Sequence, residues 1–389
     1  MKLAALIIKY TLLTCAAAFA GVFAAVILSP SIKYTQNPEG LSGAVRYASF
    51  AASGSDATGP SSEIATSHEE TPHNLSEAPE TTLVLAEETT EIPSDTAAEV
   101  RFPTEGIFAS VNEQVRRALV NIYCTRRGDG TLRTTVGSGV IISPQGVVLT
   151  NAHVAELFLL EGTTEAGTTR CFLRAGSPAR NAYEAELLYI PTRWVEEFAP
   201  DLNAREARGT GEEDFALLLI TNAADSDDDL PETFPYVPVN TAERAIAIDE
   251  QLIVGGYPAL VGTLSSINKH LYLVSALSTV KKLYTFEEET LDLFSLNGTI
   301  ASEHGVSGGA AANAQGELVG IIVTSTQAPT ALERELRVLS SAYINRELRA
   351  ETGETLSEFS NGNVRSIMRT FQEEELPVLT DLILKQNNP

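Results

Sequence analysis

Residues 303–309 read "EHGVSGG", with three glycines around Ser307 and an alanine-rich apolar segment directly after them. Glycine loses more backbone entropy on folding than other residues, so such a cluster indicates a backbone that needs positive φ or a close approach. A tight loop here would turn its N–H groups inward, and such a nest binds developing negative charge. Taken alone, the stretch favours an ordinary glycine-rich hairpin over a catalytic loop. A catalytic serine also needs a base, and an acid to orient that base.

The base has few candidates, because the chain contains five histidines. His68 and His73 lie in a polar, acidic segment, and His270 lies in an alternating strand pattern. His153 ends the stretch "GSGVIISPQGVVLTNAHV", in which two predicted strands joined by a Pro-Gln-Gly turn deliver it to a strand end. A histidine in that position is most often structural, so His153 needs support from the rest of the chain.

The acid has many candidates, and Asp214 in "EDFALLLI" is distinguished by its position directly before a long apolar strand. A carboxylate there would be partly buried, although most acids at strand starts are turn residues. The segments around His153, Asp214 and Ser307 occur in this order. Together they resemble the trypsin-like (chymotrypsin-fold) serine proteases, and most closely their bacterial extracytoplasmic branch of the high-temperature-requirement type. The resemblance covers roughly residues 111–347.

This resemblance implies a role for each matched residue. His153 corresponds to the general base, Asp214 to its buried orienting acid and Ser307 to the nucleophile, while the N–H groups of Gly305 and Ser307 correspond to the oxyanion hole. The implied activity is a serine endopeptidase that hydrolyses peptide bonds through an acyl-enzyme intermediate. We expect peptide or protein substrates, including unfolded ones, and neither a metal ion nor a cofactor. His304 would lie at the entrance of the specificity pocket.

The chain also departs from the family pattern. Val306 stands where Asn or Asp is common, Ala310 stands where Pro is usual, and residues 348–389 are too few for the PDZ domain that follows the protease in this branch. The position six residues before the serine is Ala301, so no acid is present to prefer Arg or Lys in the substrate. Small or medium apolar side chains are the expected substrate residues. Residues 191–213 form an insertion before Asp214 that carries Trp194.

Two other functions are compatible with these motifs. The first is a latent sensor protease that becomes active when a partner or a misfolded peptide orders the loop around Ser307. The second is a catalytically silent binding scaffold. Silent relatives usually lose a triad residue, and all three are present here, so the motifs favour an enzyme.

Short β-rich runs dominate the folded part of the chain. Six such runs separated by Gly, Pro and acidic turns lie at about 115–222, and a second set lies at about 235–345. This spacing predicts an all-β protein with barrels or sandwiches in tandem. The family resemblance implies two six-stranded antiparallel β-barrels, and helical spacing predicts a short helical tail over 348–389.

The N-terminal hundred residues differ in composition from the rest. An apolar run from Tyr10 to Leu28 is long enough for one bilayer crossing and predicts a transmembrane signal anchor over 10–29. Lys2 and Lys9 would keep residues 1–9 in the cytoplasm and place the protease domain outside, in the periplasm or extracellular space. A small-residue pattern at 18–20 leaves secretion after signal cleavage as the alternative.

Residues 51–104 are rich in Ser, Thr, Glu and Pro and predict a disordered acidic tether. The formal net charge of -24 argues against nucleic-acid binding. The sequence does not indicate an oligomeric state.

Cys124 and Cys171 would be the two cysteines on the outer side of the membrane. An even number of cysteines in an oxidising compartment suggests a disulfide between them. Two buried thiols are the alternative interpretation.

Overall fold

The computed structural model describes residues 45–48, 104–128, 131–163, 167–198, 206–259, 270–286, 290–325 and 330–387. The predicted anchor over 10–29, the preceding residues 1–9 and the predicted tether up to residue 103 lie outside these ranges. Within the ranges, none of the helices has both the length and the hydropathy that a membrane crossing requires.

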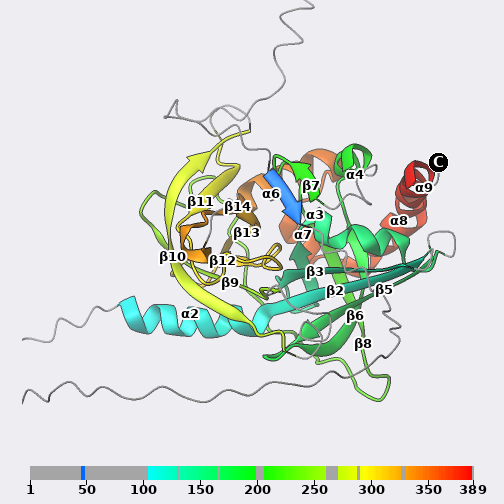
Figure 1. The fold of residues 1–389 in the computed structure, drawn as a ribbon, viewed down its shortest axis with the longest axis horizontal. Helices are drawn as coiled ribbons and strands as arrows, with labels where there is room; N and C mark the ends of the chain where they lie inside the picture. Colours follow the sequence, from blue (N-terminus) through cyan, green and yellow to red (C-terminus); the bar gives the residue numbers. More distant parts are fainter. Residues whose placement is uncertain are drawn as a thin grey trace, which may run out of the picture. The chain divides into compact units, whose positions relative to one another are not determined.

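The first β-barrel follows helix α2 (Thr104–Ala118) and is a closed, antiparallel barrel of six strands (Figure 1). Large apolar side chains such as Ile122, Leu149 and Leu173 are fully buried in its core. Going round the barrel, the strands are β2 (Leu119–Gly128), β3 (Thr131–Ile141), β4 (Val147–Thr150), β8 (Ala216–Ala223), β6 (Arg180–Tyr189) and β5 (Thr168–Ala175).

The second barrel is also closed, antiparallel and six-stranded. A separate apolar cluster that includes Leu252, Phe294 and Ile322 fills its interior. The two barrels confirm the predicted all-β, chymotrypsin-like architecture. The strands of this barrel, in order, are β10 (Val274–Tyr284), β11 (Leu293–Leu296), β14 (Leu336–Ser340), β13 (Leu318–Ser325), β12 (Ala310–Ala312) and β9 (Gln251–Gly256).

Short elements connect the strands. After β4 come α3 (Ala152–Ala155) and the 3-10 turn η1 (Glu156–Leu160), and η3 (Ala331–Glu333) precedes β14. The predicted insertion contains α4 (Thr192–Phe198), on which Trp194 is buried and packs against Phe198. The insertion also contributes β7 (Glu206–Gly209), which pairs antiparallel with β1 (Val45–Ala48).

The C-terminal part of the chain is helical, as predicted, and its first helix begins at Ser341 rather than near 348. This start is set by Ser340, whose hydroxyl accepts a hydrogen bond from the Tyr343 N–H and so caps the helix. The four helices are α6 (Ser341–Thr352), α7 (Leu356–Asn361), α8 (Val364–Glu374) and α9 (Leu376–Asn387).

The last two helices pack against the first barrel, where Figure 1 shows them in red beside β6. Phe371 of α8 is buried, and its ring lies 6.4 Å from that of Tyr189 at the end of β6. The Thr380 hydroxyl of α9 donates to the Leu159 carbonyl in η1 at 2.8 Å. The helical tail is therefore part of the core rather than an appendage.

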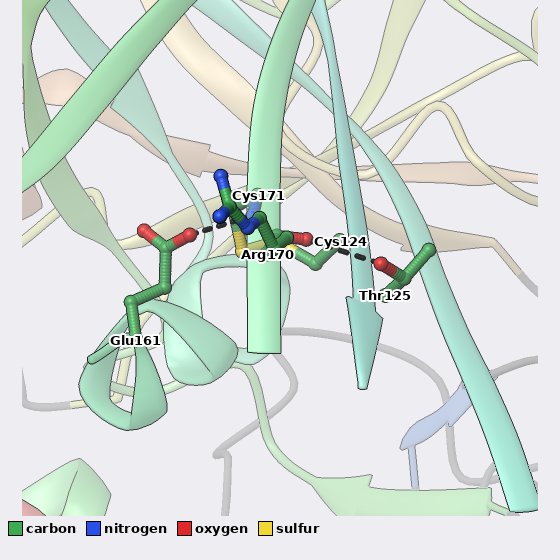
Figure 2. Close-up of a disulfide and its surroundings, with 5 residues drawn as sticks. All are labelled: Cys124, Thr125, Glu161, Arg170 and Cys171. Atoms are coloured by element: carbon green, nitrogen blue, oxygen red, sulfur yellow. Dashed lines mark hydrogen bonds between the residues drawn. A yellow bond between two sulfur atoms is a disulfide. The ribbon is translucent and has the colours of Figure 1, made fainter. Parts of the chain in front are cut away.

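A disulfide joins Cys124 of β2 to Cys171 of β5, which are directly paired residues of neighbouring strands (Figure 2). The structure thus contains the predicted bridge, and both cysteines are buried. Figure 2 shows Glu161 reaching the backbone of the bridged strand, where its carboxylate accepts the Cys171 N–H at 2.6 Å. Burial raises the pKa of Glu161 to about 7.

Candidate active site

The first barrel brings His153 and Asp214 into direct contact. His153 lies on α3, just beyond the end of β4, and Asp214 comes directly before the core strand β8. The two side chains meet at 2.7 Å between His153 Nδ1 and Asp214 Oδ2, and the His153 backbone N–H donates to Asp214 Oδ1 at 3.0 Å. Because Asp214 is fully buried, its carboxylate holds the imidazole in one orientation and favours the tautomer that carries hydrogen on Nδ1.

The backbone before Asp214 is held in an uncommon conformation. Glu213 has φ of 56°, a left-handed value that is rare for residues other than glycine. Its N–H donates to the Tyr343 hydroxyl at 3.1 Å, and its carboxylate pairs with Arg193 of α4 at 2.8 Å. Burial raises the pKa of Glu213 to about 7, although Arg193 lowers it. Contacts from α4 and α6 therefore support the turn that presents Asp214.

The glycines around Ser307 are required by close contacts and by backbone conformation. Gly305 and Gly308 both have positive φ, at 92° and 82°. A Cβ on Gly308 would lie 2.0 Å from the carbonyl oxygen of Ser138, a residue of the first barrel. A side chain at this position would push the two barrels apart, which explains the glycine cluster better than a hairpin does.

Ser138 of β3 connects the first barrel to the serine loop, and sequence reasoning did not identify it. Its backbone N–H donates to the Ser307 carbonyl at 2.7 Å, and its hydroxyl donates to the Gly305 carbonyl at 2.8 Å. The same hydroxyl accepts the Tyr257 N–H at 2.9 Å. The available signal was a serine flanked by glycines in an otherwise apolar strand, "TVGSGVII".

The groups of the loop itself have defined orientations. The Ser307 hydroxyl donates to the Val323 carbonyl of β13 at 3.1 Å. The N–H groups of Gly308 and Gly309 donate to Ile322 and Val306. Within the described part of the chain, the N–H groups of Gly305 and Ser307 form no hydrogen bond, so they are available to an oxygen atom placed beside them.

The rest of the loop is held from outside. His304 is exposed, and its carbonyl accepts the Ala259 N–H at 2.6 Å. Glu303 pairs with Arg334 at 2.6 Å. Ala301 is buried and brings no charge to the site.

One further carboxyl affects the electrostatics near His153. Glu156 of η1 keeps some exposed surface, but its carboxyl is closely surrounded by protein. Burial, the largest cause, and the negative charge of Asp214 together raise its pKa to about 8, although the positive charge of Arg126 lowers it. Glu156 is thus protonated at neutral pH and adds little charge beside Asp214 under those conditions.

Comparison with known families agrees with this geometry. Residues 137–321 match the family described as a trypsin-like peptidase domain. This region of the chain is therefore similar in sequence to trypsin-like peptidase domains. The matched span runs from β3 to β13 and includes His153, Asp214 and Ser307, whereas the C-terminal helices lie outside it. No curated protein matches the sequence significantly. The narrower assignment to the high-temperature-requirement branch stays a prediction.

Proposed function

We propose that the protein is a serine endopeptidase with His153, Asp214 and Ser307 as its catalytic triad. The observation that carries this proposal is the 2.7 Å contact between the buried Asp214 carboxylate and His153 Nδ1 within a trypsin-like peptidase domain. A buried acid that orients a histidine leaves Nε2 to act as the base. The loop that carries Ser307 is tied to the same barrel through Ser138.

In the proposed mechanism, His153 Nε2 removes the hydroxyl proton as Ser307 Oγ attacks the substrate carbonyl carbon. Asp214 stabilises the resulting imidazolium. The carbonyl oxygen becomes negatively charged and accepts hydrogen bonds from the N–H groups of Gly305 and Ser307. Collapse of this intermediate breaks the C–N bond, and His153 protonates the leaving amine. Water then attacks the acyl-enzyme by the same steps and releases the carboxylic acid.

One observation favours the latent form of this enzyme. The Ser307 hydroxyl donates to the Val323 carbonyl, and this hydrogen bond must be exchanged for one to His153 before attack. A partner or a misfolded peptide that draws Ser307 away from Val323 would therefore activate the enzyme. A silent binding scaffold has no comparable support, because all three triad residues are present.

Labelling and proteolysis of the full-length protein test these functions together. We expect a small fluorophosphonate to modify Ser307 and no other serine, as read by peptide mass spectrometry, with Ser307→Ala as the unlabelled control. Efficient cleavage of unfolded casein would support a constitutive enzyme, and labelling with little cleavage would support latency. Folded protein that is not labelled would contradict the peptidase proposal.

We also propose that residues 10–29 anchor the protein in the cell membrane, with the N-terminus in the cytoplasm and the peptidase domain outside. The disulfide supports this location, because such bonds persist in oxidising compartments. Alkaline carbonate extraction of cell membranes should leave the full-length chain in the membrane pellet. Release of a protein whose N-terminus begins at Gly21 would instead establish secretion after signal cleavage.

A further inference from the structure

Arg337, in the middle of β14, is a buried arginine on the outer face of the second barrel. Its neighbours Leu336 and Val338 belong to the cluster inside the barrel, so strand alternation directs Arg337 outward. Only 6% of its surface is exposed. Its guanidinium carbon lies 6.0 Å from the centre of the Tyr284 ring, and its buried Nε has no hydrogen-bond partner among the residues that the structure describes.

No carboxylate in the described ranges forms an ion pair with Arg337, in contrast to three other arginines of the protein. Arg334 pairs with Glu303, Arg193 pairs with Glu213, and Arg346 pairs with acids on two segments. An unpaired buried cation is costly, and arginine cannot relieve this cost by losing its proton. A binding partner that brings a negative charge would offset the cost.

A second unpartnered polar group lies beside Arg337. Ser295 of β11 is directly opposite Arg337 in the strand register, so the two Cβ atoms are neighbours. Ser295 is fully buried, and its hydroxyl has no hydrogen-bond partner among the described residues. Two neighbouring strands, which Figure 1 shows side by side, therefore supply a guanidinium and a hydroxyl that can both donate to one acceptor.

The strand pairing places these groups close to Ser307. The Ser307 hydroxyl contacts the Val323 carbonyl, and the next residue of β13, Thr324, is the register partner of Arg337. Paired Cα atoms lie ~5 Å apart, which puts the Arg337 Cα roughly 10 Å from the Ser307 hydroxyl. An extended arginine side chain and a glutamate side chain of the substrate together bridge about this distance.

The loop that leads to Ser307 is also held at this end of β14. Arg334, two residues before the strand, donates to the Ser302 carbonyl at 3.3 Å. The serine loop is thus in direct contact with the segment that leads into the strand of Arg337.

We propose that Arg337 and Ser295 bind a side-chain carboxylate of the substrate, so that the protein cleaves on the carboxyl side of glutamate or aspartate. The proposal rests on the proposed peptidase function. A guanidinium presents two parallel N–H donors that match a carboxylate, and the substrate would provide the charge that the buried Arg337 lacks. It replaces the expectation of small apolar side chains, which considered only the uncharged position Ala301.

A pair of covalent probes tests this inference without requiring turnover. Two peptidyl diphenyl phosphonates differ only in the residue next to phosphorus, which carries a glutamate-type or a glutamine-type side chain. We would measure the second-order rate of Ser307 labelling in the full-length protein by intact mass spectrometry. The glutamate-type probe should react at least about tenfold faster, since a site built around a buried charge discriminates strongly against an uncharged analogue.

Variants of Arg337 test whether this residue causes the preference for the glutamate-type probe. Arg337→Gln should abolish the preference by slowing the glutamate-type probe while leaving the glutamine-type rate within about twofold, and Arg337→Lys should keep part of it. Arg349→Gln, which removes an exposed arginine of α6, is the matched control and should keep the full preference.

Equal rates for the two probes in the wild-type protein would overturn the inference, as would a preference that Arg337→Gln leaves unchanged. If Arg337→Gln fails to fold, the ratio of the two probe rates in Arg337→Lys tests the inference. If neither variant folds, the ratio in the wild-type protein tests it. A separate reaction with the small fluorophosphonate distinguishes failure of the specificity proposal from failure of the peptidase proposal. Ser307 labelled by that reagent but without preference for the glutamate-type probe contradicts only the specificity, whereas no labelling contradicts the peptidase proposal itself.

Discussion

Asp214 acts on the proposed chemistry through its contact with His153 Nδ1, so its side chain offers a specific test of the triad. Asp214→Asn keeps the shape of the side chain but presents an N–H to His153 Nδ1, which favours the wrong tautomer. We expect kcat to fall by about 10⁴ while the fold is kept. Hydrolysis of a peptide substrate and near-UV circular dichroism measure the two effects.

Ser307→Ala should lower kcat by about 10⁶, and the exposed Ser357→Ala on α7 is its matched control. Wild-type turnover by Ser307→Ala would refute the serine mechanism. Wild-type turnover by Asp214→Asn would remove Asp214 from the triad and leave the serine mechanism open.

Glu156 makes the stability of the protein depend on pH. Its pKa rises from an ordinary value near 4.5 in the unfolded chain to about 8 in the folded one, because burial disfavours the charged form. Between these values the unfolded chain binds fewer protons than the folded one, so this carboxyl destabilises the protein as pH rises through that window. Above pH 8 the folded chain also loses this proton, so the protein's stability falls no further from this carboxyl.

Glu156→Gln removes this ionisation and should therefore raise the urea midpoint at pH 8.5 and change it little at pH 5. The exposed Glu232→Gln is the control and should leave the difference between the two pH values unchanged. A Glu156→Gln variant that is equally stabilised at both pH values would argue against a raised pKa at this position.

The disulfide links two strands that are already paired by hydrogen bonds. It closes a loop with a sequence separation of 47 residues, for which the chain-entropy estimate is roughly 4 kcal/mol. The double variant Cys124→Ala and Cys171→Ala should melt several degrees lower and retain the proposed peptidase activity at low temperature. A reductant should lower the melting temperature of the wild type towards that of the variant and leave the variant unchanged. A thiol assay that finds both cysteines free in exported protein would contradict the bridge.

The C-terminal helices α8 and α9 pack against the first barrel. Phe371 of α8 packs on Tyr189, and α9 is tied to η1, the turn that follows the His153 segment. Phe371→Ala should lower the free energy of unfolding by about 3–5 kcal/mol, because it leaves a cavity between α8 and the barrel. Urea denaturation measures the effect.

Val378→Ala on α9 is the matched control, since Val378 is 66% exposed and its truncation should change stability by less than about 0.5 kcal/mol. Equal, small effects of both variants would mean that the tail does not contribute to the folded core.

Much of this architecture follows from local patterns that are visible in the sequence. Alternating apolar residues and Gly or Pro turns mark the strands of both barrels, because each strand buries one face and each turn needs a particular backbone conformation. His153, Asp214 and Ser307 became triad candidates because the segments around them, taken in order, resemble those of trypsin-like serine proteases. Each lies in a short segment whose neighbouring residues indicate the local conformation, such as the glycines around Ser307 or the apolar run after Asp214.

Other features depend on contacts between distant segments, and only the folded structure decides them. Ser138 looks like an ordinary strand residue until the second barrel brings the Gly305 and Ser307 carbonyls to it. Arg337 reads as an ordinary charged strand residue, and its burial without an acid follows from how β11, β13 and β14 pair. Local patterns report the conformation of a segment, whereas burial and hydrogen-bond partners depend on what packs against it. The strand-rich segments, the cysteine pairing and the triad candidates were therefore within reach of the sequence, but the connection between the barrels and the unpaired arginine were not.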